Sequence, residues 1–443
     1  MRQSEQIAAL KKELRGLLGD DGVSTDEKSI EKFSLDGAVM SPVIMEQLPL
    51  GRADLVAHPG SAEQIGQVVA AAVRHGVPVT PRGKGTGNYG QSIPMPNGLV
   101  LDMSRAQSIL EVGDGYITAE AGALTLSLEE QARGSDQELQ IYPSMVRSTV
   151  GGFLAGGSGG TGSIEHGSTT SGDFVLALDV VHATGSPELI RVEGEQARAY
   201  LHNYGTAGFI ARATVKLEPL RDWRTLYASF EDFSGVLASL RPFRNLRKVP
   251  RLVSGDLPEI AAALPKNPGI PAGRASLRAI VEASVLEEAR AIVAENAGTV
   301  ELVVDDPQEM ITVSALSYNH PIHWFQQAVD ETYFHVEVSG ENLIDRIDEV
   351  HEVYQGAKLH IEAQYHHPIG MLAGVYQNKE DVEAGFQRLT ALGVGYHNPH
   401  QWNVDFALEQ TVKLAAETDP RGLLNPGKLN PEYRGPEKGA ISS

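Results

Sequence analysis

The chain has 443 residues, of which 42% are hydrophobic, so it is long enough for two or three domains that each bury a core. Its formal net charge of -20 argues against unassisted binding to nucleic acid or to an anionic membrane, because both need a basic surface. The lack of cysteine excludes disulfides, thiolate metal sites, a cysteine nucleophile and a cysteinyl link to a cofactor. The amino-terminal residues lack a secretory pattern and no apolar run reaches transmembrane length, so we expect a cytoplasmic location.

The first half of the chain alternates between short helices and strands. An amphipathic helix is predicted over residues 3–18, followed by an irregular lead-in over 25–50. Ser61 and Gln64 have the spacing of a capping box, so a helix begins there, and Gly76 ends it. Further strands are predicted near 55–59, 77–82, 99–103, 116–122, 174–181 and 209–219, and a further helix over 124–133.

Two glycine-dense stretches dominate this half. The first runs from Val77 to Gly90 and carries Arg82 and Lys84, and the second runs over residues 149–163. Glycine has no Cβ, so backbone N–H groups in such loops can approach an anion closely, and the two cations add attraction. Together the two loops favour a site for a large diphosphate cofactor.

The first loop contains a G-x-G-x-x-G string at Gly85, Gly87 and Gly90. In nicotinamide-dinucleotide folds this string must open a helix, whose N-terminus holds the pyrophosphate. Pro94 and Pro96 follow at once and are incompatible with a helix interior. The loop is therefore expected to hold phosphate through its own backbone.

Glycine thins from about residue 221, and strands then alternate with helices. Strands are predicted over 225–230, 276–284, 333–338 and 358–365, and helices over 286–296, 343–354, 379–392 and about 406–417. This α+β pattern indicates a separate sheet covered by helices on one face. The tail after Tyr433 is expected to be disordered.

Two of these strands alternate polar and apolar side chains. By the period of two, one polar face carries Tyr333, His335 and Glu337, and the other carries His360, Glu362, Gln364 and His366. An ordinary solvated sheet face is an equally good interpretation. The functional interpretation is that these side chains roof a pocket, where a histidine would serve as the base.

Histidine and aromatic residues also cluster at 318–324 and 396–402. Most of these rings are expected to fill the rim of the core. The second cluster, however, lies near the boundary of the predicted second domain, and pockets often form at domain boundaries. Tyr396 and His397 are therefore candidate substrate contacts. His360, Glu362 and His366 have side chains that bind zinc, but their spacing is a weak signal and no metal is predicted.

In order, these signals resemble the FAD-binding domain of the FAD-linked oxidases, the family of vanillyl-alcohol oxidase and p-cresol methylhydroxylase. The resemblance rests on segments 77–87, 148–152, 156–162 with Gly167, 204–210, and Asp-Pro-x-Gly-Leu-Leu-Asn-Pro-Gly-Lys at 419–428. It covers roughly residues 50–220 and 405–430 and implies an α+β fold, with a two-part FAD-binding domain of the vanillyl-alcohol oxidase type and a separate α+β substrate (cap) domain.

The resemblance also implies domain bounds and site residues. The expected units are an amino-terminal helix and lead-in (1–50), the FAD-binding domain (51–220), the cap domain (221–400), a segment returning to the FAD domain (401–432) and a disordered tail (433–443). The implied FAD ligands are Arg82, Gly83, Lys84, Gly85, Thr86 and Gly87 around the diphosphate, Ser144, Thr149, Gly152, Gly159, Ser163 and Gly167 along the diphosphate and flavin, Ile210, Asn425 and Lys428. The candidate catalytic residues are His335, His360, Glu362, His366, Tyr396 and His397.

Two departures from the family pattern refine these expectations. Many members attach the flavin to a histidine in the glycine loop, and the corresponding residue here is Thr86, so FAD is expected to be non-covalent unless a histidine such as His166 is used. The metal-binding strings of the hydroxy-acid branch, Gly-His-x-Gly-Asp-Gly-Asn-x-His and Gly-Glu-His-Gly, do not occur. Their absence argues against a metal-assisted D-2-hydroxy acid dehydrogenase.

The resemblance implies an FAD-dependent oxidoreductase that takes a hydride from a small alcohol, an aryl alcohol or phenol, or a hydroxy acid, and passes electrons to oxygen or another acceptor. One alternative is an NADPH-dependent flavin reductase of the UDP-N-acetylenolpyruvylglucosamine type. Another is a flavin-binding protein without catalysis. The expected partner is a small-molecule substrate, and the resemblance points to a homodimer; neither nucleic acid nor a membrane is expected as a partner.

Overall fold

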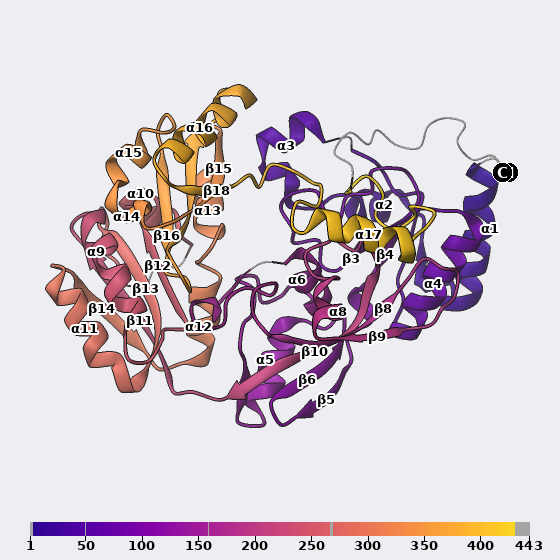
Figure 1. The fold of residues 1–443 in the computed structure, drawn as a ribbon, viewed down its shortest axis with the longest axis horizontal. Coiled ribbons are helices and arrows are strands. Elements are labelled where there is room, and N and C mark those ends of the chain that lie inside the picture. Colours follow the sequence, from indigo (N-terminus) through magenta and orange to yellow (C-terminus); the bar gives the residue numbers. More distant parts are fainter. Residues whose placement is uncertain (1–2, 49, 158, 266–268, 430–443) are drawn as a thin grey trace.

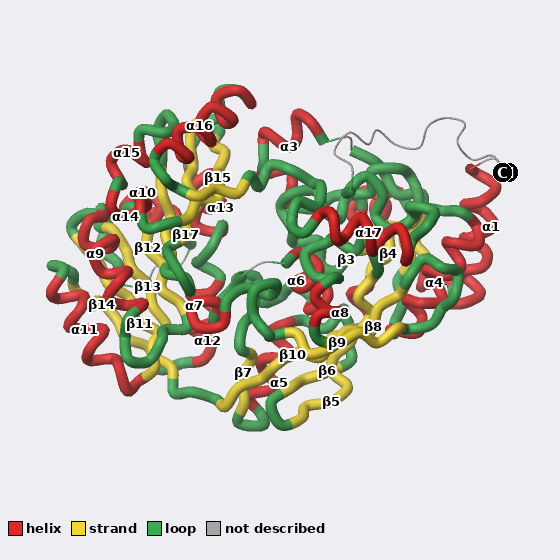
Figure 2. The backbone as a smooth tube through the Cα atoms, in the orientation of Figure 1, coloured by secondary structure: helices red, strands yellow, loops and turns green. Residues whose placement is uncertain are grey.

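The computed structural model describes residues 3–48, 50–157, 159–265 and 269–429. The chain forms an amino-terminal module with two sheets and a second module with one large sheet, and these lie side by side (Figure 1). A return segment, residues 398–429, leads from the second module back over the first. Figure 2 shows the same arrangement by secondary structure.

The first sheet of the amino-terminal module has the strand order β1-β2-β4-β3. Its strands are β1 (Val23–Ser24), β2 (Leu55–Ala57), β3 (Val79–Arg82) and β4 (Leu99–Asp102), and its helices include α1 (Gln3–Leu18) and α4 (Ala62–His75). β2 and β3 both run parallel to β4. The predicted caps of α4 are present, since the Ser61 hydroxyl accepts from the Gln64 amide and Gly76 adopts a left-handed φ of 66°.

The second sheet is antiparallel and has the order β5-β6-β10-β8-β9, with β7 paired to β10. Its strands are β5 (Ile109–Gly113), β6 (Tyr116–Glu120), β7 (Gln137–Leu139), β8 (Val175–Val181), β9 (Ile190–Glu193) and β10 (Phe209–Pro219). The helices are α5 (Thr125–Arg133), α6 (Val150–Gly156), α7 (Ser163–His166) and α8 (Glu195–Arg198). The central strand β10 continues into the second module after a short turn.

The second module is built on eight antiparallel strands in the order β14-β11-β13-β12-β16-β17-β15-β18. They are β11 (Trp223–Phe230), β12 (Leu252–Asp256), β13 (Ala275–Glu282), β14 (Thr299–Val304), β15 (Tyr333–Ser339), β16 (Lys358–Glu362), β17 (Ile369–Val375) and β18 (Gly395–His397). The helices are α9 (Phe233–Arg244), α10 (Pro258–Ala263), α11 (Leu286–Glu295), α12 (Pro307–Ser314), α13 (His320–Ala328), α14 (Asn342–Asp345), α15 (Ile347–His351) and α16 (Lys379–Ala391).

The apolar face of this sheet packs as the alternating pattern predicts. Phe334, Val336 and Val338 share one buried cluster with residues of α9, α11 and α14–α16. The opposite face is not left bare, however, because α12 packs against β11 and β13, and α10 and α13 pack near β15 and β17. The sequence predicted helices on one face only. The part of the second face that these helices leave uncovered points toward the amino-terminal module.

The return segment ends against the strand that carries the first glycine loop. After α17 (Leu408–Thr418), the amide of Asn425 donates to the Val79 carbonyl at 2.7 Å, and the Val79 amide donates to Leu423 at 2.8 Å. The Asn425 side chain donates to the carbonyls of Gln91 and Tyr204 at 3.0 and 2.8 Å. The chain end therefore fixes the base of the loop.

Two segments contain more structure than the sequence indicated. The lead-in over 25–50 contains α2 (Glu27–Phe33) and α3 (Pro42–Gln47), and the single helix expected over 343–354 is divided into α14 and α15. The tail predicted to be disordered, 433–443, lies outside the described residues.

Three buried histidines lie where the modules and the return segment meet. The ring of His335 on β15 lies 5.7 Å from the rings of both His323 and His400. His400 Nδ1 bonds to the Ser41 hydroxyl at 2.7 Å, and His335 Nε2 to the Tyr89 hydroxyl at 3.2 Å. Burial lowers the pKa of His323 to about 3 and of His400 to about 4, and lowers that of His335 well below 6.5.

These histidines predict a loss of stability in mild acid. Their folded-state pKa values lie below the unfolded value near 6.5, so the unfolded chain binds more protons between these values and stability falls as the pH drops from 6.5 to 4. A histidine that is neutral in the folded protein and protonated in the unfolded chain lowers the unfolding free energy by ~1.4 kcal/mol for each pH unit. We expect His323→Gln to flatten the slope of unfolding free energy against pH in urea titrations. The control is His367→Gln, an exposed histidine, and an equal effect of both variants would contradict the prediction.

Asn425→Ala removes both side-chain hydrogen bonds and leaves two backbone carbonyls unpaired. We expect a loss of ~1–3 kcal/mol of unfolding free energy, because Asn425 is buried and its partners stay buried. Urea unfolding of the protein without added cofactor measures this. Asn403→Ala, in the same return segment, serves as the control. A change within ~0.5 kcal/mol would show that the clamp is dispensable.

Candidate functional site

A cavity of about 1080 Å³ lies between the two modules. Its walls include both glycine loops, residues of β10 and the preceding turn, and a set of polar side chains from the second module. This volume slightly exceeds the usual range of small-molecule sites, about 300–1,000 Å³, so it suits a large ligand.

The first glycine loop leaves β3 at the carboxyl end of the parallel strands. Within the described residues, no hydrogen-bond partner is found for the amide groups of residues 84–88, which line the cavity. Gly85 adopts a left-handed φ of 65°, and residues 83–98 contain no helix, as Pro94 and Pro96 predict. A row of free amides at this position is an anion site of the nest type.

The two cations of this loop have different environments. Arg82 is buried, and its guanidinium donates to the Leu35 carbonyl at 2.5 Å and lies over the Phe33 ring at 5.6 Å. A Cβ on Gly85 would lie 2.1 Å from this guanidinium, so Arg82 supports the loop from beneath. Lys84 is exposed and lines the cavity, so its charge can reach a ligand directly.

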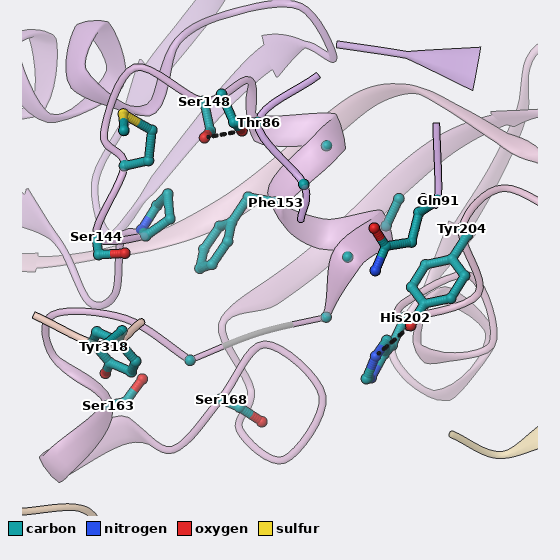
Figure 3. Close-up of a pocket in the computed structure, with 18 of the residues that line it drawn as sticks. Thr86, Gln91, Ser144, Ser148, Phe153, Ser163, Ser168, His202, Tyr204 and Tyr318 are labelled. Carbon is teal, nitrogen blue, oxygen red and sulfur yellow. Dashed lines mark hydrogen bonds between the residues drawn. The ribbon is translucent and has the colours of Figure 1, made fainter. Parts of the chain in front are cut away.

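The second loop is pressed against the first. Thr149 caps α6 by accepting from the Gly152 amide at 3.2 Å, and a Cβ on Gly83 would lie 2.2 Å from the Thr149 hydroxyl oxygen. The hydroxyls of Thr86 and Ser148 join the loops at 2.8 Å, as Figure 3 shows. Only glycine at position 83 allows this contact.

Beyond α6, the second loop is shaped by close backbone approaches. A Cβ on Gly160 would lie 2.0 Å from the Tyr142 carbonyl, and one on Gly162 would lie 1.9 Å from the Gln140 carbonyl. The Ser163 hydroxyl accepts from the Gly160 amide at 2.8 Å. The loop thus follows the cavity wall with its backbone rather than with side chains.

Most of the predicted FAD ligands meet in this cavity. Those on its wall are Arg82, Gly83, Lys84, Gly85, Thr86, Gly87, Ser144, Thr149, Gly152, Gly159, Ser163, Gly167 and Ile210. Asn425 and Lys428 are not on the wall: Asn425 holds Gln91 and Tyr204, and Lys428 donates to the Gly90 carbonyl at 2.6 Å. Burial lowers the pKa of Lys428 to about 7, against the opposing charge of Asp36. Both residues fix the far end of the first loop.

The cavity fits FAD on grounds of shape and charge. Its first loop offers Lys84 and amides without partners among the described residues to a diphosphate, its glycines let the loops pack where any Cβ would collide with neighbouring protein atoms, and residues of both modules line it. The loop threonine, Thr86, is hydrogen-bonded to Ser148. It has no ring nitrogen for attachment to a flavin.

The predicted catalytic residues do not lie together. His366 and His397 are on the cavity wall, but His335, His360 and Glu362 are buried elsewhere. Tyr396 is exposed, and its ring stacks on Phe386 at 4.6 Å, outside the cavity wall. His335 belongs to the buried cluster of His323, His335 and His400 described above.

His360 is enclosed by charged partners. Its Nδ1 bonds to Asp256 at 2.8 Å and its Nε2 to Glu362 at 3.0 Å, while Arg278 pairs with Asp256 at 2.5 Å. Burial alone would lower the pKa of His360, but the two carboxylates outweigh it and raise the pKa to about 9. With both nitrogens engaged and the ring fully buried, His360 has no access to a ligand in the cavity.

This charged network instead fixes a tyrosine of the cavity wall. The Tyr318 amide donates to Glu362 at 2.6 Å, and its backbone has a left-handed φ of 58°. The Tyr318 hydroxyl donates to the Gly160 carbonyl at 2.5 Å and accepts from Gln364 at 2.8 Å. Tyr318 thus joins the second module to the second glycine loop (Figure 3).

Several side chains of the wall were not among the predicted site residues, namely Tyr89, His202, Tyr204, Tyr318, Glu337 and Gln364. Glu337 and Gln364 were on the predicted polar faces, and Tyr318 opened a histidine and aromatic cluster, so a signal existed for these three. His202 has a left-handed φ of 53° and bonds through Nε2 to the Tyr204 hydroxyl at 3.3 Å. No local pattern singles out His202 or Tyr89.

Neither a metal cluster nor a membrane span is found in the described parts of the chain. No group of three histidine, aspartate or glutamate side chains there has the arrangement needed to hold a metal ion. No helix there combines the length and hydropathy needed to cross a bilayer.

Comparisons with known proteins agree with this geometry. A family profile described as "FAD binding domain" matches residues 53–190. The glycolate oxidase subunit GlcD of Bacillus subtilis is 30% identical over 44% of this chain and 44% of its own length. A D-lactate dehydrogenase of Archaeoglobus fulgidus is 28% identical over 40% of this chain and 41% of its own. The chain thus spans about half or less of the length of the curated relatives it matches.

The likeness extends further in three dimensions. A solved structure of alkyldihydroxyacetonephosphate synthase superposes with a TM-score of 0.73 over 94% of this chain and 85% of that one, at 18% identity. The match covers both modules and confirms the predicted fold class. Residues 53–190 therefore carry an FAD-binding domain, and in its two glycine loops and its fold the chain is similar to the FAD-linked oxidoreductases, the family of vanillyl-alcohol oxidase and p-cresol methylhydroxylase.

Proposed function

We propose that this protein is an FAD-dependent oxidoreductase that oxidises the hydroxyl-bearing carbon of a small hydroxy acid. The observation that carries the proposal is the joint presence of the FAD-binding domain and curated relatives named for such substrates. These are the GlcD subunit of glycolate oxidase, D-lactate dehydrogenases, and a D-2-hydroxyglutarate dehydrogenase of Xanthomonas citri that is 30% identical over 37% of this chain.

The cavity supports this chemistry through its two unlike halves. FAD, when bound, supplies a two-electron acceptor. The amides of residues 84–88 and Lys84 would hold its diphosphate, and α6 with the second loop would hold the rest. The remaining wall belongs to the second module, and the substrate would lie against it.

That second wall is polar and carries groups that bind hydroxyl and carboxylate oxygens. Asn319 and Gln364 offer amide donors, and Glu337 offers an acceptor. Hydrogen bonds with Asp405 and Glu337 raise the pKa of His397 to about 10, so its imidazole carries a proton at neutral pH. A polar wall of this kind would orient a small polar substrate through hydrogen bonds.

The names of the relatives favour a hydroxy acid over plain or aryl alcohols. They do not favour the NADPH-dependent reductase of the UDP-N-acetylenolpyruvylglucosamine type, and a flavin-binding protein without catalysis would leave the polar second wall unexplained.

We expect the purified protein to bind FAD without a covalent bond, because Thr86 occupies the loop position of the attaching histidine. Acid precipitation should leave the yellow colour in the supernatant. Lys84→Gln should raise the dissociation constant of FAD by about 1.5-fold to fivefold, the effect of one exposed charge. Lys413→Gln, an exposed lysine of α17, is the control. Colour in the pellet would contradict the non-covalent prediction and would direct attention to His166.

Anaerobic mixing of the FAD-loaded protein with a panel of hydroxy acids tests the function itself. We expect at least one of glycolate, D-lactate and D-2-hydroxyglutarate to bleach the flavin absorbance, since oxidation of the substrate must reduce the cofactor. Primary and aryl alcohols form the comparison set, and readmitting oxygen shows whether oxygen serves as the acceptor. Bleaching by NADPH alone, with none by any hydroxy acid, would refute the proposal.

A further inference from the structure

One row of side chains on the second module's sheet reaches the cavity. Strand register places Glu337 of β15 directly beside Met371 of β17 on one side and His397 of β18 on the other. Glu337, Met371 and His397 all line the cavity. This row faces the glycine loops of the amino-terminal module.

Glu337 is held by a histidine that is itself held by a second carboxylate. His397 Nδ1 donates to Glu337 Oε2 at 2.9 Å, and His397 Nε2 donates to Asp405 Oδ2 at 2.5 Å. Asp405 also accepts from the Gln401 side chain at 2.6 Å. Asp405 orients the imidazole of His397, as the aspartate of a hydrolase triad orients its histidine, and His397 in turn orients Glu337.

The other oxygen of Glu337 has room for a ligand. In the described structure its single hydrogen bond is a long one, 3.5 Å from the Tyr89 hydroxyl. Burial raises the pKa of Tyr89 well above 10, so the phenol keeps its proton and can only donate to this oxygen. A carboxylate oxygen with one weak donor and open lone pairs toward a cavity is suited to accept a hydroxyl proton.

We propose that Glu337 is the base that takes the substrate's hydroxyl proton, with His397 and Asp405 as positioning residues. This inference rests on the proposed function. The O–H bond breaks and its proton goes to Glu337, while the C–H hydrogen leaves with its bonding pair to the oxidised cofactor. The alcohol carbon becomes a carbonyl carbon, so the two hydrogens and two electrons lost by the substrate are accounted for.

Several titratable groups face Glu337. They are Tyr89 from the first loop, His202 and Tyr204 from the turn before β10, His397 of β18, and His400 and Asp405 of the return segment. Burial lowers the pKa of both His202 and His400. His397 is therefore the positively charged neighbour near neutral pH.

The test compares Glu337→Gln with wild type in anaerobic flavin bleaching, using the hydroxy acid found for wild type. We expect a loss of rate of about 10²–10⁴-fold, the contribution of a general base, with FAD content unchanged. Glu337→Asp, which keeps a carboxylate, should restore part of the rate. Glu331→Gln, an exposed residue just before β15, should match wild type.

A second readout needs neither cofactor nor turnover. The measurement is an NMR titration of the cofactor-free protein with isotope-labelled histidine. The His397 resonance is assigned by its loss in His397→Gln, and we expect it to titrate well above neutral pH. Asp405→Asn should lower that pKa and slow bleaching about tenfold. A wild-type His397 that titrates near 6.5 would overturn the positioning role.

The two proposals fail separately. If no hydroxy acid bleaches the flavin of the wild-type protein, both the proposed function and the proposed role of Glu337 as the base are wrong. Bleaching of wild type that survives in Glu337→Gln to within threefold overturns the base alone and leaves the function standing.

Discussion

The contact between the two glycine loops is the constraint on which the site depends. Gly83 lies so close to Thr149 that a Cβ would be 2.2 Å from its hydroxyl oxygen, and Thr86 and Ser148 bond at 2.8 Å beside it. Because β3 and α6 are both anchored in buried cores, the loops have little freedom to separate. This fixed approach keeps the amides of residues 84–88 facing the cavity, without partners among the described residues, although each would otherwise seek one.

Contacts from the return segment and from the second module support the two glycine loops from opposite sides. The return segment pairs with Val79 at the base of the first loop, and Lys428 holds its far end at Gly90. On the opposite side, Tyr318 reaches from the second module to the Gly160 carbonyl, and the buried charges of Glu362 and His360 fix its backbone. Residues far apart in sequence thus stabilise one short arc of backbone.

Sequence alone could locate the glycine-loop wall of the cavity, because glycine density and the prolines after Gly90 are local signals. It could not choose among the polar residues of the second module. Alternation places His360 and Glu337 on equivalent faces, but only the fold shows that Arg278 and Asp256 from other strands enclose His360. The terminal motif likewise predicts that Asn425 and Lys428 lie near the first loop. It does not predict which side of the loop they contact.

The contrast between two histidines of this sheet bears on the chemistry. Each lies between two carboxylates: His360 between Asp256 and Glu362, and His397 between Glu337 and Asp405. Arg278 adds a second positive charge to the first set, so it is neutral when fully ionised and can be completely buried. Among the described residues no arginine or lysine pairs with the second set, which retains a net negative charge at the cavity wall. Glu337 and His397 of the second set also line the cavity, whereas His360 and Glu362 of the first set do not, so only the second set can contact a ligand there.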